Sequence, residues 1–163
     1  MNTTTYMIML GLPLGLAFMI LYTIYGNKGG GAVRKSLTGI LPIYEPDLES
    51  GHHKRAVRTI LSNTDHITDD TEKAIYYVLA ARALVAAKDF RQALFSAEIA
   101  TASFPKHFEG SYKKFQNYKD ECATLGDQCR EKLDADMIKE ATSAADGLKN
   151  GTAKEIAAWF DVA

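Results

Sequence analysis

The chain has 163 residues and a formal net charge of −1, with 24% charged and 47% hydrophobic residues. This balance gives no strong electrostatic case for nucleic acid as a partner. Two cysteines are too few for a disulfide framework, and the chain beyond its first apolar stretch is about the size of one domain.

Residues 6–25 form one uncharged stretch, YMIMLGLPLGLAFMILYTIY. At about 1.5 Å per residue, a helix of this length spans about 30 Å, which is the hydrocarbon thickness of a bilayer. The preceding MNTTT carries no side-chain charge and no small-residue cleavage pattern follows, which is unlike a secretory signal. We therefore expect an uncleaved transmembrane anchor over residues 1–25.

The charges that flank this stretch predict its orientation in the membrane, and a glycine pair within it predicts a partner helix. Basic residues follow it, beginning with Lys28, Arg34 and Lys35, and none precedes it. The positive-inside rule then places the remaining chain in the cytoplasm or an equivalent compartment. Gly11 and Gly15 form a G-x-x-x-G pair, which lets a second membrane helix approach closely, although glycine is also simply common in membrane helices. The expected partners are the lipid bilayer and integral-membrane protein subunits.

Residues 26–46 connect the predicted anchor to the rest of the chain. The glycines of GNKGGGA, residues 26–32, predict a flexible hinge. The apolar residues after the hinge suit a membrane or partner surface, and they equally suit packing on the chain's own domain. Pro42 and Pro46 interrupt this segment, so we expect irregular or short helical structure, with Pro46 at the first position of the next helix.

Residues 47–163 carry a helical pattern. Apolar residues recur at spacings of three and four, and no segment alternates with period two. Asp69 with Glu72, and Thr152 with Glu155, have the spacing of a capping box at a helix start. The pattern predicts about six helices joined by short loops, two of them near residues 70–87 and 90–103.

Gly126 predicts a helix end, and this prediction decides what the two cysteines can do. On one continuous helix, the Cα atoms of Cys122 and Cys129 would lie about 10 Å apart, too far for a disulfide. If Gly126 breaks the helix into a hairpin, the thiols could face each other and bond, which would require an oxidising compartment. Buried thiols and a disulfide therefore stay as alternatives.

The segment 74–105, AIYYVLAARALVAAKDFRQALFSAEIATASFP, resembles a tetratricopeptide repeat. That repeat is a helix pair with an aromatic, small residues and a closing proline at fixed spacing. Here Lys88 stands in place of the usual turn glycine, Ala80 in place of a leucine and Ala97 in place of an aromatic. The matching positions are Tyr77, Ala81, Leu84, Phe90, Ala93, Ala100 and Pro105. The alternative is an ordinary helical hairpin with alanines at its contact.

The resemblance implies a stacked array of helix pairs that binds peptides or protein segments on the concave face lined by first helices. The corresponding positions are Ile75, Val78, Arg82 and Val85. They are largely apolar with one cation, which suits an apolar peptide segment, unless another helix of the same chain covers them. The expected fold class is all-α, with one N-terminal transmembrane helix followed by a tetratricopeptide-like array of about six helices.

Recognisable catalytic motifs are missing from the sequence. There is no nucleophile elbow, phosphate-binding glycine loop, dinucleotide fingerprint or zinc-protease motif, so we expect no enzyme and no catalytic, cofactor or metal site. The expected function is a membrane-anchored protein–protein interaction module, an accessory or scaffolding subunit of a larger membrane protein complex. An exposed end at Trp159 and Phe160 would fit a partner surface. The alternative is a periplasmic-side chaperone or translocation accessory factor, which a Cys122–Cys129 disulfide would favour.

Overall fold

The computed structural model describes residues 37–160, apart from the side chains of residues 37–38 and 110–112. This part of the chain is helical throughout and holds no strand, which confirms the all-α class for it. The elements are α3 (Leu37–Glu49), α4 (His53–Thr64), α5 (Asp70–Ala86), α6 (Phe90–Ser103), the 3-10 helix η2 (Gly110–Phe115), α7 (Gln116–Arg130), α8 (Ala135–Leu148) and α9 (Ala153–Ala157).

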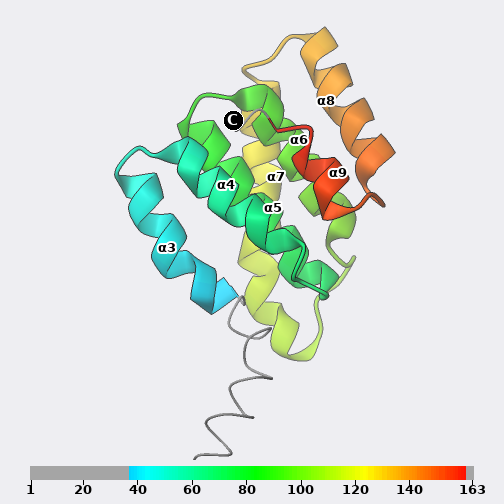
Figure 1. Ribbon diagram of the computed structural model, residues 1–163. Helices are drawn as coiled ribbons and strands as arrows, with labels where there is room; N and C mark the ends of the chain where they lie inside the picture. Colours follow the sequence, from blue (N-terminus) through cyan, green and yellow to red (C-terminus); the bar gives the residue numbers. More distant parts are fainter. Residues whose placement is uncertain (1–36, 161–163) are drawn as a thin grey trace, which may run out of the picture. The chain divides into compact units, whose positions relative to one another are not determined.

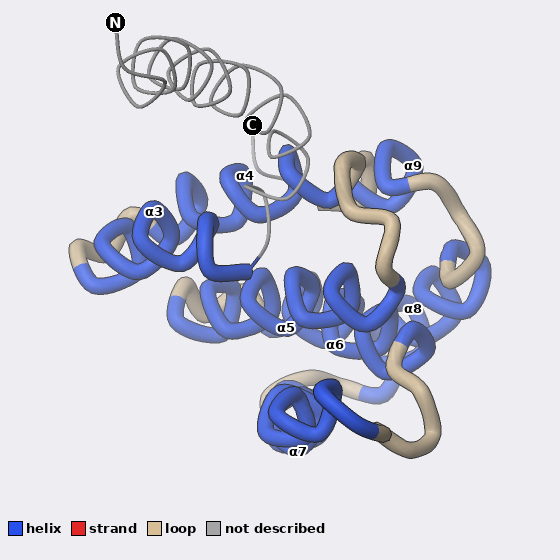
Figure 2. Tube along the Cα trace, turned by 90° about the horizontal axis from the view of Figure 1, so that it is seen from below, coloured by secondary structure: helices blue, strands red, loops and turns tan. Residues whose placement is uncertain are grey.

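The helices form layers around α5 (Figure 1). In Figure 2, α3, α4 and α9 lie on one side of the α5–α6 pair, and α7 lies on the other side. Helix α5 packs against α3, α4, α6 and α7, and ten of its 17 residues are buried. A helix that is apolar on every side belongs in a core, so α5 is the centre of the fold. Helix α8 packs against α6 and departs from the simple stacking of successive pairs.

The apolar stretch at residues 6–25 lies outside the described residues, and so do Gly11 and Gly15. Within residues 37–160, no helix has both the length and the apolar character of a membrane span.

Two predicted helix starts and the central hairpin are confirmed. The Asp69 carboxylate accepts a hydrogen bond from the Glu72 amide at 2.8 Å and caps α5. Thr152 and Glu155 form a complete capping box at α9. The helices predicted near 70–87 and 90–103 are α5 and α6, which differ from the prediction by a residue at most.

Of the two alternatives expected for residues 26–46, the described part from Leu37 onward is helical, because α3 runs through both prolines. The prediction of Pro46 at the first position of the next helix is wrong, since Pro46 lies inside α3. Pro42 and Pro46 are exposed on its outer side, while Tyr44 and Asp47 are buried on its inner side against the other helices. Tertiary packing on the inner side therefore holds a helix that the prolines alone would disfavour. The described helices accordingly begin at Leu37, within the segment expected to connect the anchor to the helical domain.

The predicted helix end at Gly126 is also wrong, since α7 continues to Arg130. A Cβ atom at position 126 would lie 3.3 Å from Nη1 of Arg130. The Arg130 side chain crosses the surface of α7 here, because it is paired with Glu98 on α6 and with Asp127. The absence of a side chain at Gly126 therefore leaves space for Arg130, which links α7 to α6. Helix α7 continues past Gly126 and has its C-cap at Glu131.

Trp159 and Phe160 are packed inside the unit, contrary to the expected exposed end. The Trp159 ring stacks on Phe95 of α6 with centroids 4.0 Å apart, and Phe160 meets Phe95 edge-on at 5.4 Å. The Arg91 guanidinium also lies over the Trp159 ring, 5.3 Å from its centroid. The C-terminal segment is thus fixed to α6 by aromatic contacts.

Lys88 sits in the α5–α6 turn in the left-handed conformation, with φ at 62°. Glycine adopts this conformation without the steric cost that a side chain carries. We expect Lys88→Gly to raise the free energy of unfolding of the full chain in detergent by about 0.5–1 kcal/mol. Lys139→Gly is the matched control, because Lys139 is exposed within α8 and its replacement should lower stability by about 1 kcal/mol. If thermal denaturation shows that Lys88→Gly and Lys139→Gly change the stability in the same direction, the left-handed conformation at Lys88 does not cost stability.

Candidate functional site

The four positions proposed for a concave peptide-binding face all lie on α5, the central helix. Ile75 and Val78 are fully buried, and Val85 is half-buried. Helices α3 and α4 pack on one side of α5 and α7 packs on another, so neighbouring helices of the same chain cover most of this surface. The four residues do not form an open face in this structure, which corresponds to the alternative that the sequence left open.

Arg82 is the polar member of this set, and it makes a two-point contact with Glu121 of α7. Its Nε atom donates to Oε1 at 2.6 Å and its Nη2 atom donates to Oε2 at 2.7 Å. Both side chains are about one third exposed, at 33% and 31%. A guanidinium held in this parallel geometry is oriented and neutralised, so Arg82 acts first as a link between α5 and α7.

Two tyrosines border the Arg82–Glu121 pair. The Tyr44 hydroxyl of α3 is buried and donates to the Leu79 carbonyl of α5 at 2.8 Å. Burial raises the pKa of Tyr44 well above its usual value, although the nearby Arg82 guanidinium acts in the opposite direction. Burial also raises the pKa of Tyr118. Both hydroxyls therefore stay protonated at neutral pH, and the cluster joins α3, α5 and α7 without offering a base.

The residues matched to the tetratricopeptide pattern lie in the α5–α6 pair or directly after it. Tyr77, Ala81, Ala93 and Ala100 are buried, which fits two helices that cross closely through small side chains. The Ser96 hydroxyl of α6 donates to the Tyr77 carbonyl of α5 at 2.8 Å. Of the other matched positions, Leu84 is buried in α5, Phe90 is half-buried at the start of α6, and Pro105 follows the C-cap of α6.

Ala97, which departs from the repeat pattern, is the site of a close approach between α6 and α7. The Cys122 thiol donates to the Ala97 carbonyl at 3.2 Å. A large aromatic at position 97, as in the repeat pattern, would add volume at a helix contact that is already fully packed. The departure from the pattern thus coincides with the place where α7 is packed on α6.

Cys122 and Cys129 are free, buried thiols on the same continuous helix. Seven helical residues place their Cα atoms about 10 Å apart, beyond the range of a disulfide. Burial raises the pKa of both thiols, that of Cys129 to about 11. Neither group is a thiolate at neutral pH, so neither has the character of a nucleophile or a redox centre.

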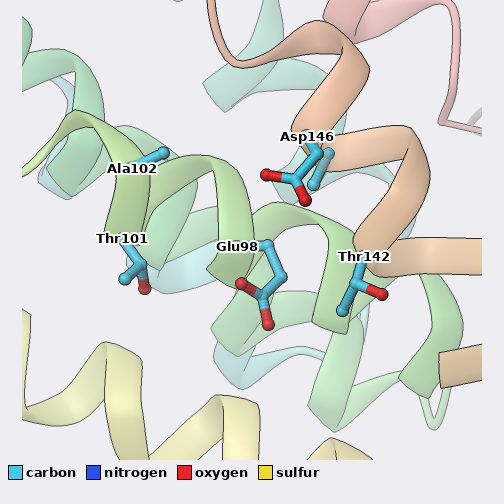
Figure 3. Close-up of a pocket in the computed structure, with 6 residues that line it drawn as sticks. Glu98, Thr101, Ala102, Thr142 and Asp146 are labelled. Atoms are coloured by element: carbon cyan, nitrogen blue, oxygen red, sulfur yellow. The ribbon is translucent and has the colours of Figure 1, made fainter. Parts of the chain in front are cut away.

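Among the hollows between the described helices, two are lined largely by polar side chains. The smaller, about 150 Å³, lies between α6 and α8, where Glu98 and Asp146 face it from opposite walls (Figure 3). Its carboxylates are engaged: Glu98 pairs with Arg130, and Asp146 lies 3.5 Å from Lys149. The larger, about 350 Å³, is lined by Asp70, Lys73, Tyr77, Ala102, Ser103, Lys149, Asn150, Gly151 and Ile156.

Metal-ligating side chains are scattered over the described part of the chain. No three or more His, Cys, Asp or Glu side chains gather there in a way that could hold a metal ion. His52 is the N-cap residue of α4 and His53 is its first residue.

Comparison with models of known protein families, with curated proteins and with solved structures gave no match for this chain. The tetratricopeptide resemblance therefore stays a prediction drawn from residues 74–105.

Two features of the described unit had no signal in the sequence. Glu121 lies 39 residues from Arg82, and nothing local marks the two as partners. The Phe95–Trp159–Phe160 cluster joins α6 to the C-terminal segment across a longer gap, 64 residues from Phe95 to Trp159. The capping box at Thr152 was the available hint that the last segment is an ordered helix that ends at these aromatics.

Proposed function

We propose that the protein is a membrane-anchored protein–protein interaction module, an accessory or scaffolding subunit of a larger membrane protein complex. The observation that carries this proposal is the uncharged, apolar stretch at residues 6–25, directly upstream of a helical unit. Its length matches a single membrane span. The basic residues after the stretch support an orientation with the helical unit in the cytoplasm or an equivalent compartment.

The described unit supports a binding role over a catalytic one. Burial raises the pKa of Tyr76 and of Tyr77 to about 12 and holds the hydroxyls protonated. The two cysteine thiols are shifted in the same direction by burial. Catalytic nucleophiles and bases need pKa values close to working pH, so these shifts favour a structural use of the side chains.

The contacts of the unit favour partner binding through the membrane span over peptide capture on α5. Ile75 and Val78 are inaccessible, and Arg82 is occupied by Glu121. A tetratricopeptide-like stacking of helix pairs remains part of the proposal, with α5 and α6 as the repeat. The periplasmic chaperone alternative would be favoured by a Cys122–Cys129 disulfide, and the distance along α7 does not support one.

The glycine pair of the span gives a direct test of the membrane partner. We expect Gly11→Ile with Gly15→Ile to abolish co-purification of integral-membrane subunits, because branched side chains prevent close helix approach. Leu12→Ile with Leu16→Ile is the matched control, with the same spacing on a different side of the helix, and should leave co-purification intact. Equal recovery of partners with both pairs would contradict a partner helix at the glycines.

The experiment that tests the function is purification of the tagged full chain from its native membrane in mild detergent, followed by mass spectrometry. Stoichiometric integral-membrane partners would support an accessory subunit and would name the assembly. Recovery of the protein alone, or with small amounts of soluble proteins, would overturn it in favour of a free adaptor or chaperone.

A further inference from the structure

The outer side of α3 carries an apolar stripe formed by Gly39, Pro42, Ile43 and Pro46, and all four residues are exposed. Ile43 is 56% exposed, and Met137 on α8 is the only other large hydrophobic side chain in the described residues that is similarly exposed. The spacing of three and four residues puts the stripe on one side of the helix. The inner side is fixed by buried Ile40 and Tyr44, so the stripe cannot turn inward.

The stripe lies in α3, the first of the described helices that follow the proposed anchor in the sequence. Residues 26–36 separate the apolar stretch from Leu37, and this linker reaches at most about 40 Å when fully extended. A surface held so close to a bilayer meets it at a high effective concentration. A stripe too small to bring a free protein to a membrane can therefore rest on one to which the chain is already tethered.

We propose that the exposed apolar stripe of α3 lies on the lipid bilayer, at the level of the headgroups. This inference rests on the proposed membrane anchor. Proline has no N–H, so the carbonyl of Pro42 lacks the helical donor that residue 46 would otherwise supply. That carbonyl needs water or a headgroup donor, which excludes the hydrocarbon core and fits the interface.

The lipid contact is apolar in character. Glu45 and Glu49 are exposed along the edge of the stripe, and they would be repelled by an anionic surface. The contact should therefore form on a zwitterionic surface without anionic lipid, and it should persist when salt is raised, because salt screens charge but not apolar burial.

The test uses the full chain reconstituted in phosphatidylcholine vesicles, with an environment-sensitive fluorophore on Ile43→Cys. Pro42→Cys is a second reporter on the stripe, and Met137→Cys is the matched exposed apolar control on α8. Cys122 and Cys129 are buried and stay in place, and wild type treated with the dye gives their background. Nitroxide lipids with the quencher near the headgroup or near the chain end measure depth, and alkaline carbonate extraction measures anchoring.

We expect a blue shift and a loss of emission at positions 42 and 43, stronger with the headgroup quencher, and neither change at 137. If the protein resists carbonate extraction but the fluorophores at positions 42 and 43 emit like the one at position 137, the inference is overturned while the anchor is retained. Equal quenching at all three positions would overturn it as well, because the contact would not be specific to α3. Release by carbonate would overturn both the anchor and the inference. Quenching that appears in vesicles but is lost in native membranes would assign the stripe to a protein partner instead.

Discussion

Phe95→Ala is expected to be the most damaging single substitution in the described unit. Phe95 is fully buried in α6 and contacts both Trp159 and Phe160, so its removal leaves a cavity and detaches the C-terminal segment. Loss of a buried phenylalanine lowers the free energy of unfolding by about 3–5 kcal/mol. For a unit of this size we expect the melting temperature to fall by about 10–20 °C.

The chain has a single tryptophan, so its fluorescence reports this cluster directly. In Phe95→Ala the emission of Trp159 should shift to the red as its ring loses the stacked partner. Met137→Ala is the control, since Met137 is 44% exposed on α8 and its truncation should change stability by less than about 0.5 kcal/mol. A melting temperature for Phe95→Ala close to that of Met137→Ala would mean that the C-terminal segment does not dock on α6.

Ala93→Leu is expected to have the second largest effect. Ala93 is fully buried where α6 crosses α5, and three additional carbon atoms cannot be placed there without moving one helix. Overpacking of this kind costs about 1–3 kcal/mol. Thermal denaturation of the full chain in detergent measures it.

Ala102→Leu is the matched control for this crossing. Ala102 is exposed on the same helix, so the larger side chain should cost little there. Even a small loss of stability shifts the melting temperature by several degrees. If Ala93→Leu melts within about a degree of wild type, the alanines do not set a close helix crossing and the repeat assignment fails.

Local chemistry made some parts of this fold predictable. A side-chain cap is encoded within four residues, so Asp69 and Thr152 marked the starts of α5 and α9. The turn between α5 and α6 was also visible, because Lys88 and Asp89 occupy a pattern in which one residue must take a positive φ. These features depend on neighbours in the chain and need no knowledge of the tertiary structure.

The failures arose where distant residues decide the outcome. Pro42 and Pro46 disfavour a helix locally, but burial of Tyr44 against α5 outweighs that preference. Gly126 has the composition of a helix end, yet it serves the Arg130 side chain that reaches Glu98. A helix with one apolar side shows in its sequence which side faces the core. The buried residues of α5 lie all around the helix, so its sequence did not show which side is covered and which is free.

The central position of α5 has a consequence for the order in which the protein can be made. Helices α3 and α4 precede α5 and can cover one side of it as soon as it emerges from the ribosome. The other sides wait for α6 and α7, and α7 ends 44 residues after Ala86. At about 5–20 residues per second, this apolar helix is incompletely covered for about 2–9 s of synthesis. A nascent chain that stops before Arg130 therefore exposes apolar side chains of α5 that the finished unit buries, and under the proposed anchor the surface nearest to them would be the bilayer.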